Sequence, residues 1–389
     1  MSVVIASFAR TPFAKYLGAF ATVPATVLGA HAARAALSRA GVSGSDINRV
    51  IVGQVVQAAA GQNPARQTAV GAGVPLSVPA STINAVCLSG MLAITDGVRL
   101  IESGEADIVL AVGQESMSLA PHAQIASRAG TKFGAIQLAD TLELDGLFDA
   151  FEQRSMGAST ESQNEPLGIT RAEQDAWAAR SHHSLAASVG FLAEEIEPFT
   201  VDGRKPVTLA YDDGLRAETT AESLARLRPA FGAGGTITAA TSSQLTDGAA
   251  AVALMRESLA SERGVQALAR IVASAFVAGP DVYLHAQPSN AIVAALARSR
   301  FETTDLSAVE INEAFAAVAV HSVRQLGIDR GIVNTHGGAI ALGHPIGASG
   351  TRIVGHLARR LAALGSSTIG AAGICGGGGQ GSAIVLEAI

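Results

Sequence analysis

The stretch "CLSGMLAITDGVRLIESGEADIVLAVG", from Cys87 to Gly113, decides the fold class. Apolar side chains recur in it at helical spacing, at Met91, Ile94, Val98 and Ile101. The part that ends at Gly113, "ADIVLAVG", is typical of a buried strand. A strand-like segment, "STINAV", precedes Cys87. This order of strand, helix and strand predicts a parallel sheet with covering helices.

The same plan recurs near the end of the chain. Ser89 opens the helix, and Gly113 closes the next strand 24 residues later. Ser349 opens a second helix, and Gly373 closes a second strand, again 24 residues later. The two copies are offset by 260 residues, and the segments "DGAAAVALM" and "QGSAIVLEA" have similar endings. A shared spacing together with a shared ending predicts a duplicated α/β half.

The predicted fold is therefore α/β, with two similar halves and one insertion. The first half covers residues 1–117 and 246–268, and the second half covers residues 269–389. The insertion, residues 118–245, contains the helix start "TRAEQ", in which Thr170 is the expected cap and Glu173 follows three residues later. We expect the insertion to grow out of the first half as a loop domain.

Composition excludes several classes of protein. A chain of 389 residues with 48% hydrophobic and 15% charged residues suits two or three well-buried domains. The net charge of −6 argues against a nucleic-acid partner. No apolar run reaches the ~18–20 residues that span a bilayer, and the start has no signal-peptide pattern. Two cysteines without metal-ligand spacing predict a reducing cytoplasm, no disulfide framework and no zinc site.

Cys87 and His344 are the first candidates for chemistry. Cys87 precedes a helix, whose N-terminus favours a thiolate, so this position suits a nucleophile. The alternative is a buried structural cysteine. His344 lies between Gly343 and Pro345 in "GGAIALGHPIGASGTR", where flanking glycines leave an imidazole free to act as a general base. The alternative is a histidine that only satisfies a buried loop, and His182 and His183 are expected to face solvent.

Asn312 and Cys375 are weaker candidates when each is taken alone. Asn312 follows a strand in "VEINEAFAAV", where its amide suits an oxyanion or a water, although asparagine also caps helices. Cys375 opens "CGGGGQG", which contains a G-x-G-x-x-G pattern. A dinucleotide site needs a helix after that pattern, and the chain continues as a strand, so we reject it. Bare backbone beside Cys375 instead lets reactants approach closely and offers N–H groups to an oxyanion.

Together these motifs resemble the thiolase family over almost the entire chain, and the resemblance implies the thiolase fold, in which duplicated α/β halves give a layered αβαβα core. The motifs are "ARTPF", "VCLSGMLAI", "GQESMS", "NEAFAA", "GGAIALGHPIGASG" and "CGGGGQG". Within that family the chain is most similar to bacterial acetyl-CoA acetyltransferases. The resemblance implies a ping-pong condensation of two acetyl-CoA to acetoacetyl-CoA and coenzyme A, or the reverse thiolysis. The alternative is a broader-chain 3-ketoacyl-CoA thiolase of fatty acid β-oxidation.

The resemblance also implies a role for each catalytic residue. Cys87 is expected to become acylated, and His344 to take its thiol proton. Cys375 is expected to remove the α-proton of the second acetyl-CoA. His344 and a water held by Asn312 would stabilise the enolate, and the backbone N–H groups of Cys87 and Gly377 would form the second oxyanion site. Coenzyme A is then substrate and product, and no cofactor is required.

The insertion is expected to bind coenzyme A. The family pattern places nine residues at this substrate: Leu147, Met156, Arg216, Leu227, Phe231, Ala239, Ser243, Ala314 and Phe315. Arg216 suits the nucleotide phosphates, and the alternative for it is a solvated surface residue. The family further implies a homodimer or homotetramer, with "PHAQIASRAGTKFG" (residues 121–134) as a candidate contact between subunits.

Three positions depart from the family pattern. Leu88 stands where many members have glycine, Ser155 where acetoacetyl-CoA thiolases commonly have histidine, and His336 where asparagine is usual. Leu88 and Ser155 are expected to line the acyl pocket. Two other functions share the fold, a carrier-protein ketosynthase and a lipid-transfer protein. The presence of Cys375 and "NEAF" argues against the first, and the full catalytic set argues against the second.

Overall fold

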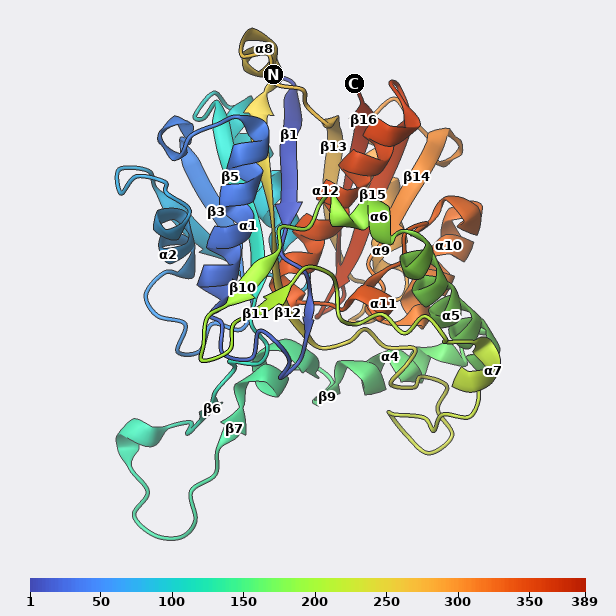
Figure 1. Cartoon of the computed structure of the whole chain (residues 1–389). Helices are drawn as coiled ribbons and strands as arrows, with labels where there is room; N and C mark the ends of the chain where they lie inside the picture. The colour runs from blue at the N-terminus through green and yellow to red at the C-terminus, as the bar shows by residue number, and fades with distance from the viewer.

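The computed structural model describes residues 1–389 and contains one ten-stranded sheet, in the order β14-β15-β16-β13-β1-β12-β5-β3-β4, with β2 added beside β12 (Figure 1). The first half supplies six of these strands: β1 (Val3–Arg10), β2 (Ala14–Lys15), β3 (Arg49–Gly53), β4 (Ala80–Ile83), β5 (Ile108–Glu115) and β12 (Thr246–Arg256). The second half supplies four: β13 (Ala269–Ala278), β14 (Leu306–Ile311), β15 (Ile369–Gly376) and β16 (Gln380–Ala388).

Helices cover and separate the two parts of this sheet. Those of the halves are α1 (Ala25–Ala40), α2 (Pro64–Gly71), α3 (Ser89–Glu102), α8 (Glu257–Glu262), α9 (Gln287–Leu296), α10 (Ala316–Leu326), α11 (Ala339–Leu342) and α12 (Ile346–Leu364). Those of the insertion are α4 (Met156–Asn164), α5 (Arg171–Ala187), α6 (Val189–Ala193) and α7 (Ala221–Leu224). Five shorter helical turns are η1 (Gly44–Asp46), η2 (Ser127–Ala129), η3 (Glu143–Leu147), η4 (Thr303–Asp305) and η5 (Arg330–Ile332).

The two halves repeat one strand pairing, as the 260-residue offset predicts. In the first half β3 is parallel to β4 and β5, while β12 is antiparallel to both β5 and β1. In the second half β14 is parallel to β15, while β16 is antiparallel to both β15 and β13. A parallel bridge between Val309 and Val333 stands in the place of β4. The halves join where β1 and β13 pair over three residues, from Val3 opposite Ile271 onward.

The prediction of a parallel sheet is wrong for the last strands of each half. β15 and β16 are joined only by the turn through Gly377, Gly378 and Gly379, and the last two have φ of +78° and +67°. So short a connection can join only antiparallel strands, because a parallel pair needs a crossover of a dozen residues or more. The glycines supply the left-handed backbone that the turn requires.

Alternating side chains divide the interior into layers. In β5, Ile108, Leu110 and Val112 pack outward with α1 and α2, whereas Val109 and Ala111 pack inward with α3 and α12. The other outer core lies between the second half of the sheet and α9 and α10. The order is helix, sheet, helix, sheet, helix, which confirms the predicted αβαβα arrangement. As predicted, α3 buries Met91, Ile94, Val98 and Ile101.

The central helices α3 and α12 cross at their first turns. A Cβ atom on Gly90 would lie 2.6 Å from the carbonyl oxygen of Gly347. A Cβ atom on Gly347 would lie 2.6 Å from the carbonyl oxygen of Gln114 at the end of β5. Both positions therefore require glycine, because no side chain fits where two backbones approach this closely. The crossing brings the segment before α3 and the segment before α12 to the same place.

The insertion also contains three two-stranded ribbons: β6 (His122–Ala123) with β7 (Ala139–Asp140), β8 (Phe148–Asp149) with β9 (Arg154–Ser155), and β10 (Phe199–Val201) with β11 (Val207–Leu209). The first of these projects from the body of the molecule (Figure 1). Buried charges on Glu195 and Asp212 join the insertion to the two halves. Arg10 on β1 is fully buried, and its Nε donates to Oε1 of Glu195 at 2.8 Å. Its Nη atoms donate to Asp212 at 2.6 and 2.8 Å. The other oxygen of Glu195 lies 2.9 Å from Nδ1 of His356 on α12.

Helix α5 begins as predicted and packs differently from expectation. Thr170 and Glu173 form the capping box, in which the Thr170 side chain accepts from the Glu173 N–H. His183 is exposed as expected, but His182 is only 3% exposed. The prediction for His182 is wrong because α5 packs against α10 and α11, which covers that face. Nδ1 of His182 accepts the backbone N–H of Arg216 at 3.2 Å. The division of the chain at residues 118 and 245 stays a prediction.

The helices are too short or too polar to cross a membrane.

Candidate active site

Cys87 lies in a tightly held loop between β4 and α3. Val86 has a left-handed φ of +52°, which is strained for a β-branched residue. Its N–H donates to Oδ1 of Asn84 at 3.0 Å, and its carbonyl oxygen accepts from Oγ of Ser89 at 2.6 Å. Ser89 Oγ also accepts the N–H of Ala85 at 2.9 Å. These bonds fix the loop so that Cys87 is half-buried directly before the first turn of α3.

Cys87 is held as a thiol. Burial raises the pKa of Cys87 to about 12, and the negative charge of Glu115 raises this pKa further, while the backbone N–H groups of Gly377 and of Cys87 itself lower it. The N–H groups favour a thiolate, as expected at a helix N-terminus, and desolvation outweighs them. A base must remove the proton when the sulfur reacts. The contact with Gly377 places the turn after β15 beside this thiol.

Cys375 lies at the end of β15 with no exposed surface, opposite Gly381 of β16. Burial raises its pKa, and the charge of Cys87 raises it further, so the two sulfurs lie near enough to couple. The glycines around it permit close approach of other chain segments. A Cβ atom on Gly379 would lie 1.8 Å from the carbonyl oxygen of Asp281. The element that follows is β16, so the structure has no helix for a dinucleotide site here.

His344 is buried between α11 and α12, and its hydrogen bonds define its tautomer. Oγ of Ser349 lies 2.6 Å from Nδ1 of His344 and donates its own proton to the carbonyl oxygen of Pro345 at 3.1 Å. Ser349 must then accept from an Nδ1–H, which leaves the lone pair on Nε2. Nε2 has no partner within the chain. Burial, with the charge of Arg352, lowers the pKa of His344 to about 4, so the imidazole is a neutral base at neutral pH.

Asn312 follows β14 and is fully buried, and neither Oδ1 nor Nδ2 has a partner in the chain. Its backbone N–H donates to the carbonyl oxygen of Gly373 on β15 at 3.0 Å, which holds it beside the strand that carries Cys375. A buried amide with both ends free is costly unless a water or a substrate atom completes it. Asn312 therefore has the chemistry of a site for a small polar group.

The structure brings five of the nine expected substrate residues next to the two cysteines. Four of them pack in one apolar cluster with Cys375, namely Met156, Phe231, Ala314 and Phe315. Leu147 packs in a second cluster that contains Cys87 and Ile346. Because Ile346 is two residues after His344, this second cluster connects the Cys87 loop with the His344 loop.

The other four expected substrate residues are less closely tied to the thiols. Ser243 donates its N–H to the carbonyl oxygen of Ala314 at 3.0 Å, and Ala314 belongs to the apolar cluster that contains Cys375. Arg216, Leu227 and Ala239 are exposed, and neither cysteine-containing cluster includes them. Their contact with coenzyme A stays a prediction.

The three departures from the family pattern have separate places. Leu88 is fully buried in the central core and packs against Gly376, where a Cβ atom would lie 2.7 Å from Cγ of Leu88. The expectation that Leu88 lines an acyl pocket is therefore wrong. Ser155 is half-buried and caps α4, accepting the N–H of Ala158 at 3.2 Å. His336 packs on Phe191, and its Nδ1 lies 3.2 Å from Nε2 of His356 on α12.

Sequence reasoning missed three buried polar residues around the site. Ser349 fixes the tautomer of His344, and its signal is a serine five residues after the histidine. Glu313 accepts from Trp177, Ser181 and Asn334 and from the backbone of Ile340, which holds α5 and α11 to the loop after β14. Glu115 ends β5 and accepts three backbone N–H groups.

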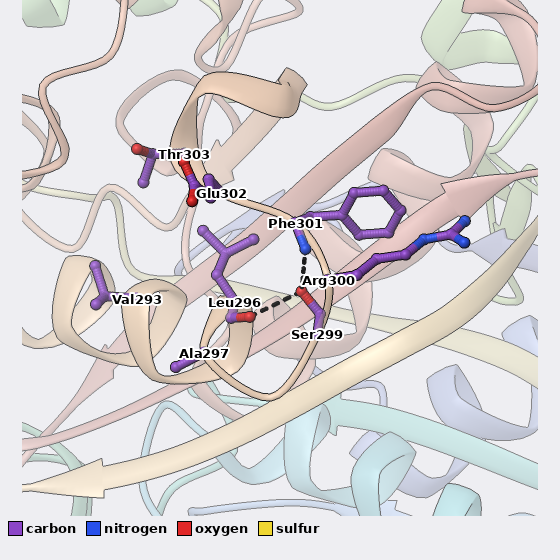
Figure 2. Close-up of a pocket in the computed structure, with 8 residues that line it drawn as sticks. All are labelled: Val293, Leu296, Ala297, Ser299, Arg300, Phe301, Glu302 and Thr303. Carbon is purple, nitrogen blue, oxygen red and sulfur yellow. Dashed lines mark hydrogen bonds between the residues drawn. The ribbon is translucent and has the colours of Figure 1, made fainter.

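A surface hollow beyond α9, of about 400 Å³, is separate from this site (Figure 2). Figure 2 shows Oγ of Ser299 donating to the carbonyl oxygen of Leu296 and accepting the N–H of Phe301. None of the predicted site residues lines the hollow. The candidate active site is therefore the region formed by the Cys87 loop, the end of β15 with Cys375, and the His344 loop.

Comparison with known proteins covers the full chain. A family model described as the thiolase N-terminal domain matches residues 3–258, and one described as the thiolase C-terminal domain matches residues 265–388. A protein named probable acetyl-CoA acetyltransferase from Mycolicibacterium smegmatis is 51% identical, covering 99% of this chain and 100% of the relative. Proteins named acetyl-CoA acetyltransferase from Shinella zoogloeoides and Cupriavidus necator are 46% and 44% identical, covering 100% and 99% of this chain and 99% of each relative.

Proposed function

Because this chain belongs to the thiolase family of acyltransferases, we propose that it is an acetyl-CoA C-acetyltransferase, which condenses two acetyl-CoA to acetoacetyl-CoA and coenzyme A or runs the reverse thiolysis. The names of its full-length relatives support the acetyl substrate. The observation that supports the mechanism is the contact between the turn after Cys375 and the Cys87 loop, where a Cβ atom on Gly377 would lie 3.5 Å from Cγ1 of Val86.

In the first stage Cys87 becomes acylated. The neutral Nε2 of His344 takes the thiol proton as the sulfur attacks the thioester carbonyl, because the raised pKa of Cys87 leaves too little thiolate otherwise. The N–H groups of Cys87 and Gly377 stabilise the oxyanion. The carbon–sulfur bond of acetyl-CoA breaks, and coenzyme A leaves with the proton from His344. Acetyl-Cys87 remains, which splits the condensation into two easier steps.

In the second stage Cys375 takes the α-proton of a second acetyl-CoA. The enolate oxygen is stabilised by the imidazole of His344 and by a water on Asn312, whose free amide suits that role. The enolate carbon attacks acetyl-Cys87, the carbon–sulfur bond breaks, and the Cys87 sulfur recovers a proton from Cys375. Holding both partners in one site removes the entropy cost of their collision. Cys375 enters this stage as a thiolate and returns to that form when it gives its proton to Cys87, and its raised pKa makes the thiolate a strong base for the α-proton.

Thiolysis of 3-ketoacyl-CoA substrates of increasing length tests this function. We expect the rate to fall sharply beyond four carbons. Replacing Cys87 with alanine is the matched control, since it removes the nucleophile and must abolish turnover of every substrate. A flat chain-length profile would favour the broader 3-ketoacyl-CoA thiolase, and full turnover by the Cys87 variant would refute the mechanism.

We also propose that the chain assembles as a homodimer or homotetramer in the cytoplasm, where its two free cysteines stay reduced. The segment from residue 121 to 140 projects from the body of the molecule as the hairpin of β6 and β7 (Figure 1). It exposes a group of apolar side chains, which is typical of a surface that contacts another subunit: Ile125, Phe133, Ile136 and Leu138. Phe133 is 99% exposed, so its replacement by serine is expected to lower the assembly mass in light scattering.

A further inference from the structure

Glu115 occupies the position in the first half that Cys375 occupies in the second. The two residues are 260 positions apart, which is the offset of the repeat. The pairing agrees, since Glu115 lies opposite Gly248 of β12 and Cys375 lies opposite Gly381 of β16. One half therefore ends this strand in a thiol, and the other ends it in a carboxylate.

The same symmetry relates what the two side chains face. Cys87 lies two residues before Ser89, and Gly347 lies two residues before Ser349. In the second half Cys375 lies beside Cys87, before α3. In the first half Oε2 of Glu115 accepts the N–H of Gly347 at 2.8 Å, in the first turn of α12. The contact of the Glu115 carboxylate with Gly347 in the first half therefore corresponds to the contact of Cys375 with Cys87 in the second half.

The carboxylate of Glu115 also contacts the first half. Oε2 accepts the N–H of Val55, and Oε1 accepts the N–H of Val56, each at 3.1 Å. The carbonyl oxygen of Val55 in turn accepts from Nδ2 of Asn84, the residue that fixes the Cys87 loop. Val55 and Val56 pack in the apolar cluster that contains Cys87 and Ile346. Glu115 therefore bonds both to Val55 and Val56, which contact the Cys87 loop, and to the start of α12.

No basic side chain pairs with Glu115, which is fully buried. Each of its three partners is a donor, and α12 is a 19-residue helix whose N-terminus favours a negative charge. Burial raises the pKa of Glu115 to about 8, with a contribution from Asp247, while the three N–H groups oppose that rise. The other titratable group that Glu115 affects is Cys87, whose thiolate its charge disfavours.

We propose that Glu115 is a positioning residue, whose carboxylate holds the start of α12, and with it His344, in register with the Cys87 loop. The inference rests on the proposed function, because it treats Cys87 and His344 as a working pair. Glu115 touches neither substrate nor the reacting atoms. It acts by tying together two loops that come from different halves and that no other charged side chain joins.

Replacing Glu115 with glutamine keeps the shape but leaves at least one of the three N–H groups facing an amide NH₂. We expect kcat for thiolysis to fall by about 100-fold with KM nearly unchanged, because a small misplacement of reacting groups costs that much. Alkylation of Cys87 by iodoacetamide at about pH 9, above the Glu115 pKa of about 8, is expected to become faster, since a negative charge beside the sulfur is gone. Turnover and thiol reactivity therefore move in opposite directions.

Controls separate this result from unfolding and from failure of the proposed function. In a folded variant iodoacetamide labels only Cys87, because Cys375 is buried, whereas in an unfolded variant it labels both thiols. Asp247→Asn is the matched variant, since it removes a neighbouring buried carboxylate that accepts from Ser118 and not from α12. It is expected to leave kcat near wild type. The alkylation shift needs no thiolase activity, so it tests Glu115 even if the substrate is another acyl-CoA.

Glu115→Asp provides a second variant that retains the charge. We expect its alkylation profile to match wild type while kcat falls by about ten-fold or more, because the shorter carboxylate cannot reach all three N–H groups. The proposal is overturned if folded Glu115→Gln turns over at the wild-type rate. It is equally overturned if Glu115→Asp does so, or if Asp247→Asn lowers kcat as much as Glu115→Gln.

Discussion

Replacing Ser349 with alanine isolates the role of the His344 tautomer. The change removes the acceptor that lies 2.6 Å from Nδ1 and leaves the protein backbone intact. Without it a buried N–H has no partner, which costs about 1–3 kcal/mol. The imidazole can escape that cost by moving its proton to Nε2, which blocks the lone pair that must take the Cys87 proton. Either result weakens the base.

The expected loss follows from that energy. Since 1.36 kcal/mol corresponds to a tenfold change in rate, kcat/KM should fall by roughly 5- to 150-fold. The assay is steady-state thiolysis of acetoacetyl-CoA near pH 7, far above the pKa of about 4 of His344, so a change in its charge does not contribute.

Ser322→Ala is the matched control for this experiment. Ser322 is also a fully buried helical serine, and its Oγ donates to the carbonyl oxygen of His285 at 2.9 Å. Its loss should lower the free energy of unfolding by about 1 kcal/mol and leave kcat/KM near wild type. An unchanged kcat/KM in folded Ser349→Ala would refute the argument that Ser349 fixes the tautomer. Equal losses in the two variants would refute it as well.

Three further predictions concern the two thiols and the buried charges. Cys375→Ala should still release coenzyme A once per site in a burst with acetyl-CoA, which acylates Cys87, yet lose steady-state condensation. The alkylation rate of Cys87 by iodoacetamide should rise continuously from pH 7 to pH 10, because its pKa of about 12 leaves the thiolate fraction growing throughout, and a plateau near pH 8 would contradict this. Glu195→Gln should lower the free energy of unfolding by about 3–5 kcal/mol in urea titrations, because it leaves the buried Arg10 without one of its partners.

The pH dependence of stability follows from the same carboxylate. Burial opposes ionisation of Glu195, but His356 and Arg10 outweigh burial and hold its pKa well below the ordinary value. A carboxyl group with a lowered folded-state pKa contributes stability that is present above its unfolded pKa of about 4.3 and is lost as the pH falls further. Urea midpoints should therefore drop steeply below about pH 4 in the wild type, and less steeply in Glu195→Gln.

The sequence predicted those parts of the fold that repeat or alternate. The spacing from Ser89 to Gly113 and from Ser349 to Gly373 identified the two halves, and the period of α3 identified its buried face. Local pattern could not reveal that β12 and β16 enter the sheet antiparallel, because their direction depends on what each strand connects to. Burial of His182 depends on helices that lie more than a hundred residues away in the chain.

The site was predicted where residue type and local context both point to chemistry. Cys87, His344, Cys375 and Asn312 each stand in a distinctive segment. Sequence could not give the protonation state of Cys87, because the local helix N-terminus favours a thiolate and only the surrounding packing decides that desolvation prevails. Ser349, Glu313 and Glu115 were missed for a related reason. Their function lies in contacts with segments far away in sequence, and serine or glutamate alone carries no such signal.

The short seam between β1 and β13 has a consequence for the order of the chain itself. Both termini lie at the same edge of the molecule as α8, where the chain passes from one half to the other (Figure 1). A circular permutant that starts at the exposed Gly264 and links Ile389 to Met1 would keep every strand pairing. The strand pairing therefore does not depend on which half of the chain is synthesised first.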